Sequence, residues 1–440
     1  MTTAVAASIP HQATPCLGEL RAEYAPVFEA IRSGAVQRER GRELPFLVVE
    51  QLKESGFTAL RIPAVFGGRG VGMADYIELL TDLAAADSNV AHLLRGHVAF
   101  IEGLLLRAPD AHRDGWLRRI GAGALIGNAN SERQELNELA TRLEERAGRP
   151  VVSGTKYYTT GSLYADWVSL TAVRAGVRHN VLVNAHHPGV QITDDWDGFG
   201  QQLTASGSLV LEDVPVDPAD IQPFDGSNPF TGFGVAVFQA VLLAVAAGIA
   251  QAALDDAVAF VRPRRRTFAN PGELVPREQE IVQTVVGELA GKVHAARLIV
   301  AGQARELERF ASRAPFASAG TAHDGGSSPA AGPAAGNAAA GTIVTGSREE
   351  ADRLALDVFK SQQVVLKLAL DTATELFEVG GASATSTASR LDRHWRNART
   401  VASHNPAKYR ARAVGDHLLN GRVQLWGSRS DAAGSTRPTP

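Results

Sequence analysis

Hydrophobic and polar residues follow three successive patterns along the chain. In the first part, apolar residues recur every three or four positions, as Val48 and Leu52 do, which predicts helices. In the middle part they alternate with polar residues, as in residues 167–171, which predicts antiparallel strands. The helical spacing then returns, with Leu289 and Val293 on one face. The expected α+β architecture has a helical domain over 19–122, an antiparallel β domain over 123–228 and a helical bundle over 229–425.

The most apolar run of the chain lies in the third part, from Ala240 to Ala250, between two glutamines. It is well short of the roughly 20 apolar residues that cross a bilayer, so no membrane span is expected. Its many small residues allow other helices to approach closely. The run therefore predicts a helix buried at the centre of the bundle.

A segment of low complexity interrupts the third part over residues 312–346, where Ala, Gly, Ser and Pro predominate. Such a composition buries too little apolar surface to offset the entropy of ordering the chain, so a disordered loop is expected. The next helix is predicted to begin at Ser347. Its hydroxyl and the Glu350 carboxylate, three residues later, have the spacing of a capping box.

Composition restricts the class of protein further. Hydrophobic residues make up 45% and charged residues 21%, with a net charge of −3, so no basic field exists to bind nucleic acid. Cys16 is the one cysteine and cannot form an internal disulfide, which favours a reducing cytoplasm. The stretch from Met1 to Leu20 lacks the features of a signal peptide and is expected to be a loose arm.

Two apparent catalytic signatures do not meet their structural requirements. His92 and His97 are five residues apart, whereas a helical zinc site uses histidines four apart with a glutamate, so no metal is expected. Ser162 lacks the Gly-x-Ser-x-Gly turn that exposes a hydrolase nucleophile. The polar residues that could build a site instead form clusters at predicted strand ends and in the last helices, at residues 128–131, 156–162, 202–206 and 394–406.

These clusters resemble the acyl-CoA dehydrogenase superfamily of flavoproteins over nearly the whole chain. The resemblance rests on the Pro63 to Gly70 turn, Gly154-Thr155-Lys156 with Ala165-Asp166, Arg264 to Phe268, and the pair Gly380-Gly381. It implies the three-part fold of that superfamily, with a C-terminal four-helix bundle and assembly as a homotetramer. It also implies a flavin between the β domain and the bundle.

The resemblance further implies which residues contact the flavin. Arg265 and the paired glycines would approach its phosphate, the arginine from a neighbouring subunit, because guanidinium binds phosphate and glycine lets backbone donors approach. For Arg265 a solvated basic surface is the alternative. The full set of expected cofactor-binding residues is Asn130, Ser131, Tyr158, Thr160, Ser162, Thr204, Ser206, Arg265, Gly380, Gly381, Ser383 and Arg396.

The chain departs from true dehydrogenases where they hold their catalytic base. Removing a proton beside a thioester carbonyl requires a carboxylate. The superfamily usually places a glutamate after its Arg-Asp-Ala segment, where this chain has Ser403-His404-Asn405-Pro406. A second known position, at the start of the bundle, is also empty, since no Asp or Glu occurs between Asp225 and Asp255.

The replacement resembles reduced-flavin-dependent monooxygenases of the dibenzothiophene monooxygenase type, over residues 377–385, 391–400 and 404–406. This implies an enzyme that receives FMNH2 from a separate NAD(P)H-dependent reductase, forms a C4a-hydroperoxyflavin with O2, and oxygenates a small sulfur, nitrogen or heteroaromatic substrate. It also implies that His404, His97, Ser162 and Asn128 are catalytic. A structural role is the alternative for either histidine.

Two other functions stay open from the sequence. One is an acyl-CoA dehydrogenase with tightly bound FAD and a base not yet located. The other is a non-catalytic interaction protein on a flavoprotein scaffold. A dehydrogenase would purify yellow and be bleached by an acyl-CoA, whereas the monooxygenase would purify nearly colourless, and the interaction protein would bind no flavin.

We predict that deleting residues 316–342 leaves folding and activity nearly unchanged, because these residues contribute little to a hydrophobic core. Thermal unfolding and turnover of the deletion variant, compared with the full chain, would check this. A large loss of either would show that the segment has a structural or functional partner.

Overall fold

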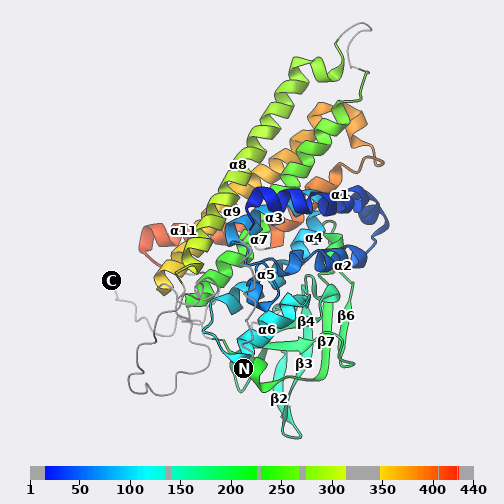
Figure 1. Cartoon of the computed structure of the whole chain (residues 1–440). Helices are drawn as coiled ribbons and strands as arrows, with labels where there is room; N and C mark the ends of the chain where they lie inside the picture. The colour runs from blue at the N-terminus through cyan, green and yellow to red at the C-terminus, as the bar shows by residue number, and fades with distance from the viewer. Residues whose placement is uncertain are drawn as a thin grey trace, which may run out of the picture.

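The computed structural model describes residues 15–133, 140–224, 229–266, 274–313, 347–404, 406–423 and 425. Helices come first along the chain, a sheet follows, and long helices complete it, so the expected order of domains is confirmed. In Figure 1 the sheet lies beneath the N-terminal helices, and the long C-terminal helices extend away from it on the opposite side. The N-terminal helices thus separate the sheet from most of the bundle.

The N-terminal part consists of helices joined by short turns. Their bounds are α1 Leu17–Gly41, α2 Phe46–Glu54, α3 Met73–Ala86, α4 Ser88–Leu93, α5 Arg95–Leu105 and α6 Ala111–Gly121. The turn predicted at residues 66–70 is present, with Gly67 and Gly70 at φ values of +96° and +63° that favour glycine. Leu20 is fully buried in α1, so the expected loose arm is wrong for its last residues: the helix begins at Leu17.

The middle part is a single sheet. Within the described residues it contains β1 Ile126–Ala129, β2 Arg142–Arg146, β3 Arg149–Tyr157, β4 Trp167–Arg174, β5 Val177–Asn184, β6 Val190–Thr193, β7 Ser208–Pro215 and β8 Ile221–Pro223. The order is β6-β7-β3-β2-β4-β5-β8, with β1 added beside β4. Most pairs are antiparallel, as the alternation predicted, but β4 pairs in parallel with β1 and with β2. Alternation shows which face a residue occupies but not the direction of the neighbouring strand.

The C-terminal part is built on three long helices and two shorter ones. Their bounds are α7 Pro229–Val261, α8 Glu280–Ala311, α9 Arg348–Glu375, α10 Asp392–His404 and α11 Ala407–Asn420. The predicted cap of α9 is confirmed, because the Ser347 hydroxyl accepts a hydrogen bond from the Glu350 backbone N–H at 3.2 Å and the Glu350 carboxylate accepts one from the Ser347 backbone N–H at 3.0 Å. Most of the predicted loop lies outside the described residues.

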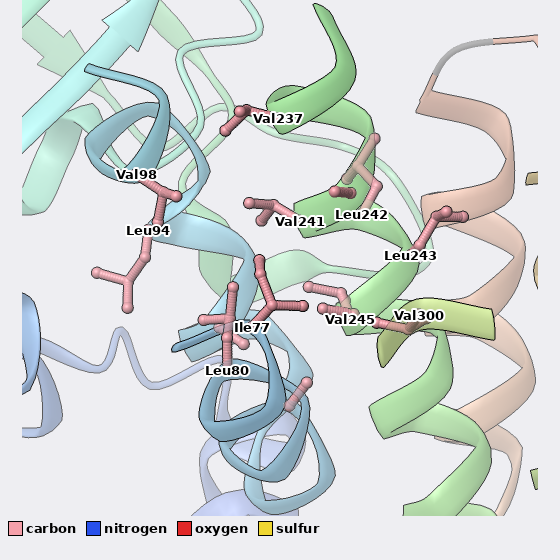
Figure 2. Close-up of a cluster of buried hydrophobic side chains, with 14 of the residues drawn as sticks. Ile77, Leu80, Leu94, Val98, Val237, Val241, Leu242, Leu243, Val245 and Val300 are labelled. Atoms are coloured by element: carbon pink, nitrogen blue, oxygen red, sulfur yellow. The ribbon is translucent and has the colours of Figure 1, made fainter. Parts of the chain in front are cut away.

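Helix α7 is the centre of the structure. It is long and apolar enough to cross a membrane, but 94% of its most apolar window is buried inside the protein. It packs against α3, α5, α8 and α9. Figure 2 shows Val241 and Val245 of α7 facing Ile77 and Leu80 of α3, with Leu94 and Val98 close by. The predicted core helix is therefore confirmed, and its packing also fixes the position of α5.

The closest approach between α7 and α3 occurs at Gly248. A Cβ added there would lie 2.4 Å from the Ala84 Cβ and 2.7 Å from the Thr81 carbonyl oxygen. By contrast, Gly287 on α8 is exposed, and a Cβ added there would have no neighbour within 4 Å. Close packing against α3 therefore requires glycine at position 248, whereas position 287 has room for a side chain.

We predict that Gly248→Ala lowers the free energy of unfolding by about 1–3 kcal/mol, because α3 must move away from α7. Gly287→Ala is the matched control and should raise it by up to about 1 kcal/mol through helix propensity. Urea denaturation at one protein concentration would measure both. Equal effects of the two substitutions would show that the contact at Gly248 is not tight.

Candidate active site

Helices α4 and α5 carry basic side chains into the protein interior. Asp87 caps α4 by accepting a hydrogen bond from a backbone N–H two residues later at 3.0 Å, and Arg38 binds the same carboxylate at 2.9 Å. The cap fixes the start of the helix. His92, Arg95 and His97 follow at positions that are all buried.

His92 is held by Gln201, a residue of the loop before β7. Its Nδ1 lies 3.0 Å from the Gln201 Oε1, and the Gln201 Nε2 donates to the Ser88 hydroxyl at 2.9 Å. In this arrangement His92 carries its proton on Nδ1. Its Nε2 is buried and has no hydrogen-bond partner within the described part of the chain. This nitrogen is therefore an available acceptor.

Gln201 itself occupies a strained backbone conformation. Its φ is +51°, in the left-handed region that non-glycine residues rarely adopt. The backbone N–H donates to the Asn397 Oδ1 at 2.6 Å, and the side chain bonds both His92 and Ser88. Backbone strain of this kind persists only where surrounding contacts fix it, and it is frequent at functional sites.

His404, the last residue of α10, completes the cluster. Its Nε2 lies 3.5 Å from a terminal nitrogen of Arg95, and its ring centroid is 5.5 Å from that of His92. The Arg95 Nε donates to the Phe238 carbonyl oxygen at 3.1 Å, and its guanidinium lies 4.5 Å above the Phe238 ring. Residues from α4, α5, α7 and α10 thus meet at one point.

Asn128 and Ser162 approach this cluster from the sheet. The Ser162 hydroxyl donates to the Asn128 carbonyl oxygen at 3.2 Å. A Cβ on Gly96 would lie 2.6 Å from the Asn128 Oδ1, and one on Gly161 would lie 2.2 Å from the Leu93 carbonyl oxygen. Glycine at these two positions allows α4 and α5 to contact strand β1 and the 160–162 turn directly.

Three predicted cofactor-binding hydroxyls form a buried group beside Ser162. The Ser206 Oγ lies 2.8 Å from the Thr160 Oγ1 and 2.7 Å from the Thr204 Oγ1. The Gly161 N–H donates to the Thr204 carbonyl oxygen at 3.0 Å. The structure therefore brings together five of the residues that the resemblance implied for the site: Asn128, Thr160, Ser162, Thr204 and Ser206.

His97 does not belong to the cluster. Its Nε2 bonds the Thr58 carbonyl oxygen at 2.8 Å, and its Nδ1 accepts from the Ile126 N–H at 3.2 Å. Both ring nitrogens thus join backbone segments, and the structural alternative accounts for this residue. The histidine that faces His404 is His92, which the sequence analysis set aside.

Arg265 and the paired glycines lie at the opposite end of α7. The Arg264 guanidinium donates to the Gly380 carbonyl oxygen at 3.2 Å, and Phe260 contacts the same glycine, whereas Arg265 is exposed. Residue 260 is about 33 Å along the helix from Phe238, at 1.5 Å per residue. One flavin cannot touch both ends of α7 in a single subunit. The contribution of Arg265 to a neighbouring subunit's site stays a prediction.

The other predicted flavin contacts lie outside the cluster. The side chains of Asn130, Ser131, Tyr158 and Ser383 are exposed, and Gly381 is exposed as well. All three guanidinium nitrogens of Arg396 bond protein acceptors: those of Asp392, Phe199 and Glu39, at 2.7, 2.9 and 2.7 Å. Arg396 therefore supports the α10 helix and the neighbouring loop in this subunit.

Burial and mutual repulsion control the protonation of the cluster. Burial, and then the nearby Arg95, lower the pKa of His92 to about 4. The same two causes, followed by His92, hold the pKa of His404 well below its usual value. Burial lowers the pKa of Arg95 to about 9. At neutral pH both histidines are neutral and Arg95 carries the one positive charge of this trio.

Comparison with known proteins places the fold in a family. A model described as "Acyl-CoA dehydrogenase, C-terminal domain" matches residues 240–409, and one described as "Acyl-CoA dehydrogenase, N-terminal domain" matches residues 20–124. Together they span more than half of the chain. The chain belongs to the acyl-CoA dehydrogenase family.

Individual members of the family are similar over nearly the whole length. The chain is 26% identical to the probable FMNH2-dependent monooxygenase SfnC of Pseudomonas putida, over 88% of this chain and 91% of that protein. It is 26% identical to the dibenzothiophene monooxygenase of Rhodococcus qingshengii, over 91% and 93% respectively. The fold matches that of FMN-bound TdsC from Paenibacillus sp. A11-2 with a TM-score of 0.80 at 24% identity, over 92% of this chain and 98% of that one.

The cluster has the chemistry that the flavin of this family requires. A flavin ring presents hydrogen-bonding atoms along one edge and apolar faces on either side. Here the His92 Nε2 and the Asn128 Oδ1 are buried without a hydrogen-bond partner in the part of the chain that the structure describes, beside the hydroxyls of Ser162 and Thr160. Buried polar atoms normally find a partner, so these atoms fit a polar ligand.

Sequence reasoning missed three residues of the site: His92, Arg95 and Gln201. The signal for the first two was present, because a histidine and an arginine three residues apart interrupt an otherwise apolar helical stretch. For Gln201 no sequence signal exists, because its role depends on a fold that brings residues 92 and 201 together.

We predict that acidification destabilises the protein through its buried histidines. Burial lowers the pKa of His97 to about 4, against about 6.5 in the unfolded chain, so unfolding takes up a proton between these values. Stability is therefore lost as pH falls from about 6.5 towards 4. His97→Gln should reduce the slope of unfolding free energy against pH by up to about 1.4 kcal/mol per pH unit.

The measurement is urea denaturation at several pH values between 7 and 5. His186→Gln serves as the control, since its side chain is 72% exposed. The absolute stability of His97→Gln will also fall, because two backbone bonds are lost, so the slope is the quantity that decides. An unchanged slope would show that His97 is protonated alike in both states.

Proposed function

We propose that this protein is the oxygenase component of a two-component, FMNH2-dependent monooxygenase. The observation that carries the proposal is the cluster itself: two neutral histidines, the buried His92 and the partly buried His404, face each other where a dehydrogenase needs a carboxylate. Within the described residues, no carboxylate forms an ion pair or hydrogen bond with His92, Arg95 or Ser162. The similarity to SfnC and to dibenzothiophene monooxygenase supports the same activity.

In this reaction the substrate gains one oxygen atom of O2, and the other leaves as water. The two electrons come from FMNH2, which ends as FMN, so a reduced flavin held by Ser162 and Asn128 would supply the activation of O2. A separate NAD(P)H-dependent reductase regenerates FMNH2. The enzyme is proposed to act as a homotetramer in the cytoplasm, on a small molecule containing sulfur, nitrogen or a heteroaromatic ring.

The residues of the cluster have distinct roles in this proposal. The Ser162 hydroxyl and Asn128 bind the polar edge of the flavin, and the three buried hydroxyls hold the turn that carries Ser162. The His92 Nε2 accepts a hydrogen bond, and His404 positions or transfers a proton at the reacting oxygen. Burial excludes water, which prevents loss of the activated oxygen as H2O2.

An FAD-dependent acyl-CoA dehydrogenase is the alternative from the sequence. Its proton abstraction requires a base near neutral pH within hydrogen-bond reach of the substrate. Neutral histidines whose pKa values are lowered by burial are weak bases, and Arg95 lowers them further. The site therefore favours oxygen transfer over proton abstraction.

We predict that protein loaded with FMNH2 without oxygen, and then mixed with oxygenated buffer, forms an intermediate absorbing in the near ultraviolet that outlives the oxidation of unbound FMNH2. Stopped-flow absorbance measures its lifetime. Immediate oxidation without an intermediate, in a protein purified yellow with FAD, would contradict the proposal and favour the dehydrogenase.

We predict that His404→Ala and His92→Ala each reduce product formation at least about 100-fold, the usual range for a positioned acid or base. Binding of FMNH2 should persist, and H2O2 release should increase as product falls. His186→Ala, an exposed histidine, is the control. Unchanged oxygenation in His404→Ala would remove that residue from the mechanism.

A further inference from the structure

Arg95 differs from Arg38, Arg61 and Arg113, three arginines shielded from solvent that each bind a carboxylate. Arg61 is also buried, and it forms two hydrogen bonds with the Glu102 carboxylate at 2.6 and 2.9 Å. Arg38 has Asp87, and Arg113 has Asp114. Arg95 is 8% exposed, and no ion pair with a described carboxylate is found for it. An unneutralised buried cation is costly, because burial removes its hydration.

The groups that do contact Arg95 are all neutral. They are the Phe238 carbonyl oxygen, the Phe238 ring and the His404 Nε2. The nearest charge that acts on it is Arg410, a second cation, which together with burial lowers the pKa of Arg95 to about 9. The positive charge is therefore maintained in a place where the described residues supply no counter-charge.

The neighbours of Arg95 indicate which kind of ligand would neutralise its charge. Arg95 lies beside His404, whose ring faces that of His92, and the His92 Nε2 is buried without a hydrogen-bond partner among the described residues. The next residue, Gly96, contacts the Asn128 side chain. An anion at this point would neutralise Arg95 while lying next to the residues assigned to oxygen transfer.

We propose that Arg95 binds an oxyanion group of the substrate, so that this enzyme oxygenates a small organic anion such as a sulfinate or a carboxylate. This inference rests on the proposed function and adds the charge of its substrate. A guanidinium binds such groups through a planar pair of donors. The reaction stays balanced for a sulfinate, which gains one oxygen to become a sulfonate while O2 and FMNH2 yield water and FMN.

The flavin phosphate is the other oxyanion that Arg95 could bind. The resemblance assigns the phosphate instead to Arg265 of a neighbouring subunit and to the pair Gly380-Gly381, and these residues lie at the far end of α7 from Arg95. Arg95 instead lies with His92, His404 and Asn128, which face the reacting groups. The substrate is therefore the favoured source of the anion, and the experiment distinguishes the two.

Matched ligands isolate the charge. Methanesulfinate and dimethyl sulfoxide have the same number of non-hydrogen atoms, but only the first is an anion. Benzenesulfinate and methyl phenyl sulfoxide form a larger pair of the same kind. Calorimetric titration of the purified wild-type protein, with and without saturating oxidised FMN, should show at least one sulfinate binding about tenfold or more tightly than its neutral partner.

Variants then assign the selectivity to Arg95. Arg95→Gln should weaken sulfinate binding about tenfold or more and leave sulfoxide binding unchanged, whereas Arg95→Lys should retain part of the preference. Arg107→Gln is the matched control: it removes a largely buried arginine beyond the far end of α5. Thermal unfolding would show that each variant folds.

The outcomes separate this inference from the proposed function. The anion role of Arg95 is wrong if wild-type protein binds FMN but binds each sulfinate no better than its sulfoxide. It is also wrong if Arg95→Gln keeps the preference for sulfinate over sulfoxide. In both cases the monooxygenase proposal stands. If Arg95→Gln weakens binding of FMN but not of riboflavin, Arg95 holds the flavin phosphate and the substrate role is overturned. If no flavin binds while sulfinate selectivity depends on Arg95, the proposed function fails and the anion site remains.

Discussion

The structure depends on burying one helix on every side. Because α7 is apolar around its whole circumference, it must be covered by α3, α5, α8 and α9, and the domains before and after the sheet cannot separate. Figure 2 shows α3 and α5 lying against α7, which places α5 beside Phe238. The same packing that satisfies the hydrophobic effect therefore positions Arg95 under the aromatic ring and carbonyl oxygen of α7.

A second constraint ties the sheet domain to this core. The loop before β7 carries Gln201, which bonds His92 through its side chain and Asn397 through its backbone. Asn397 in turn donates to Glu39 of α1 at 3.0 Å. Three domains thus meet through one strained residue. The tautomer of His92 follows from this contact, and with it the orientation of the unpaired Nε2.

The electrostatics of the site follow from burial. Removing water lowers the pKa of His92 and His404, which keeps both rings neutral and able to exchange hydrogen bonds without carrying charge. Arg95 remains the one cation between them. A buried charge of this kind is tolerated where a bound ligand neutralises it. Because the packing of α7 positions Arg95, that packing also influences which substrate is bound.

The sequence by itself determined the order of domains, the central position of α7 and the Ser347 cap, because periodicity and local spacing act over a few residues. The candidate hydroxyl residues were implied by the resemblance to a flavoprotein family. It also indicated that a histidine replaces the carboxylate at position 404. Which partner each polar residue meets was decided only by the tertiary structure. His97 bonds two backbone segments, His92 meets Gln201, and Arg396 is bound by Glu39, across separations of up to 357 residues. No local pattern encodes such contacts, since they exist only once α7 has been buried and the domains lie against it.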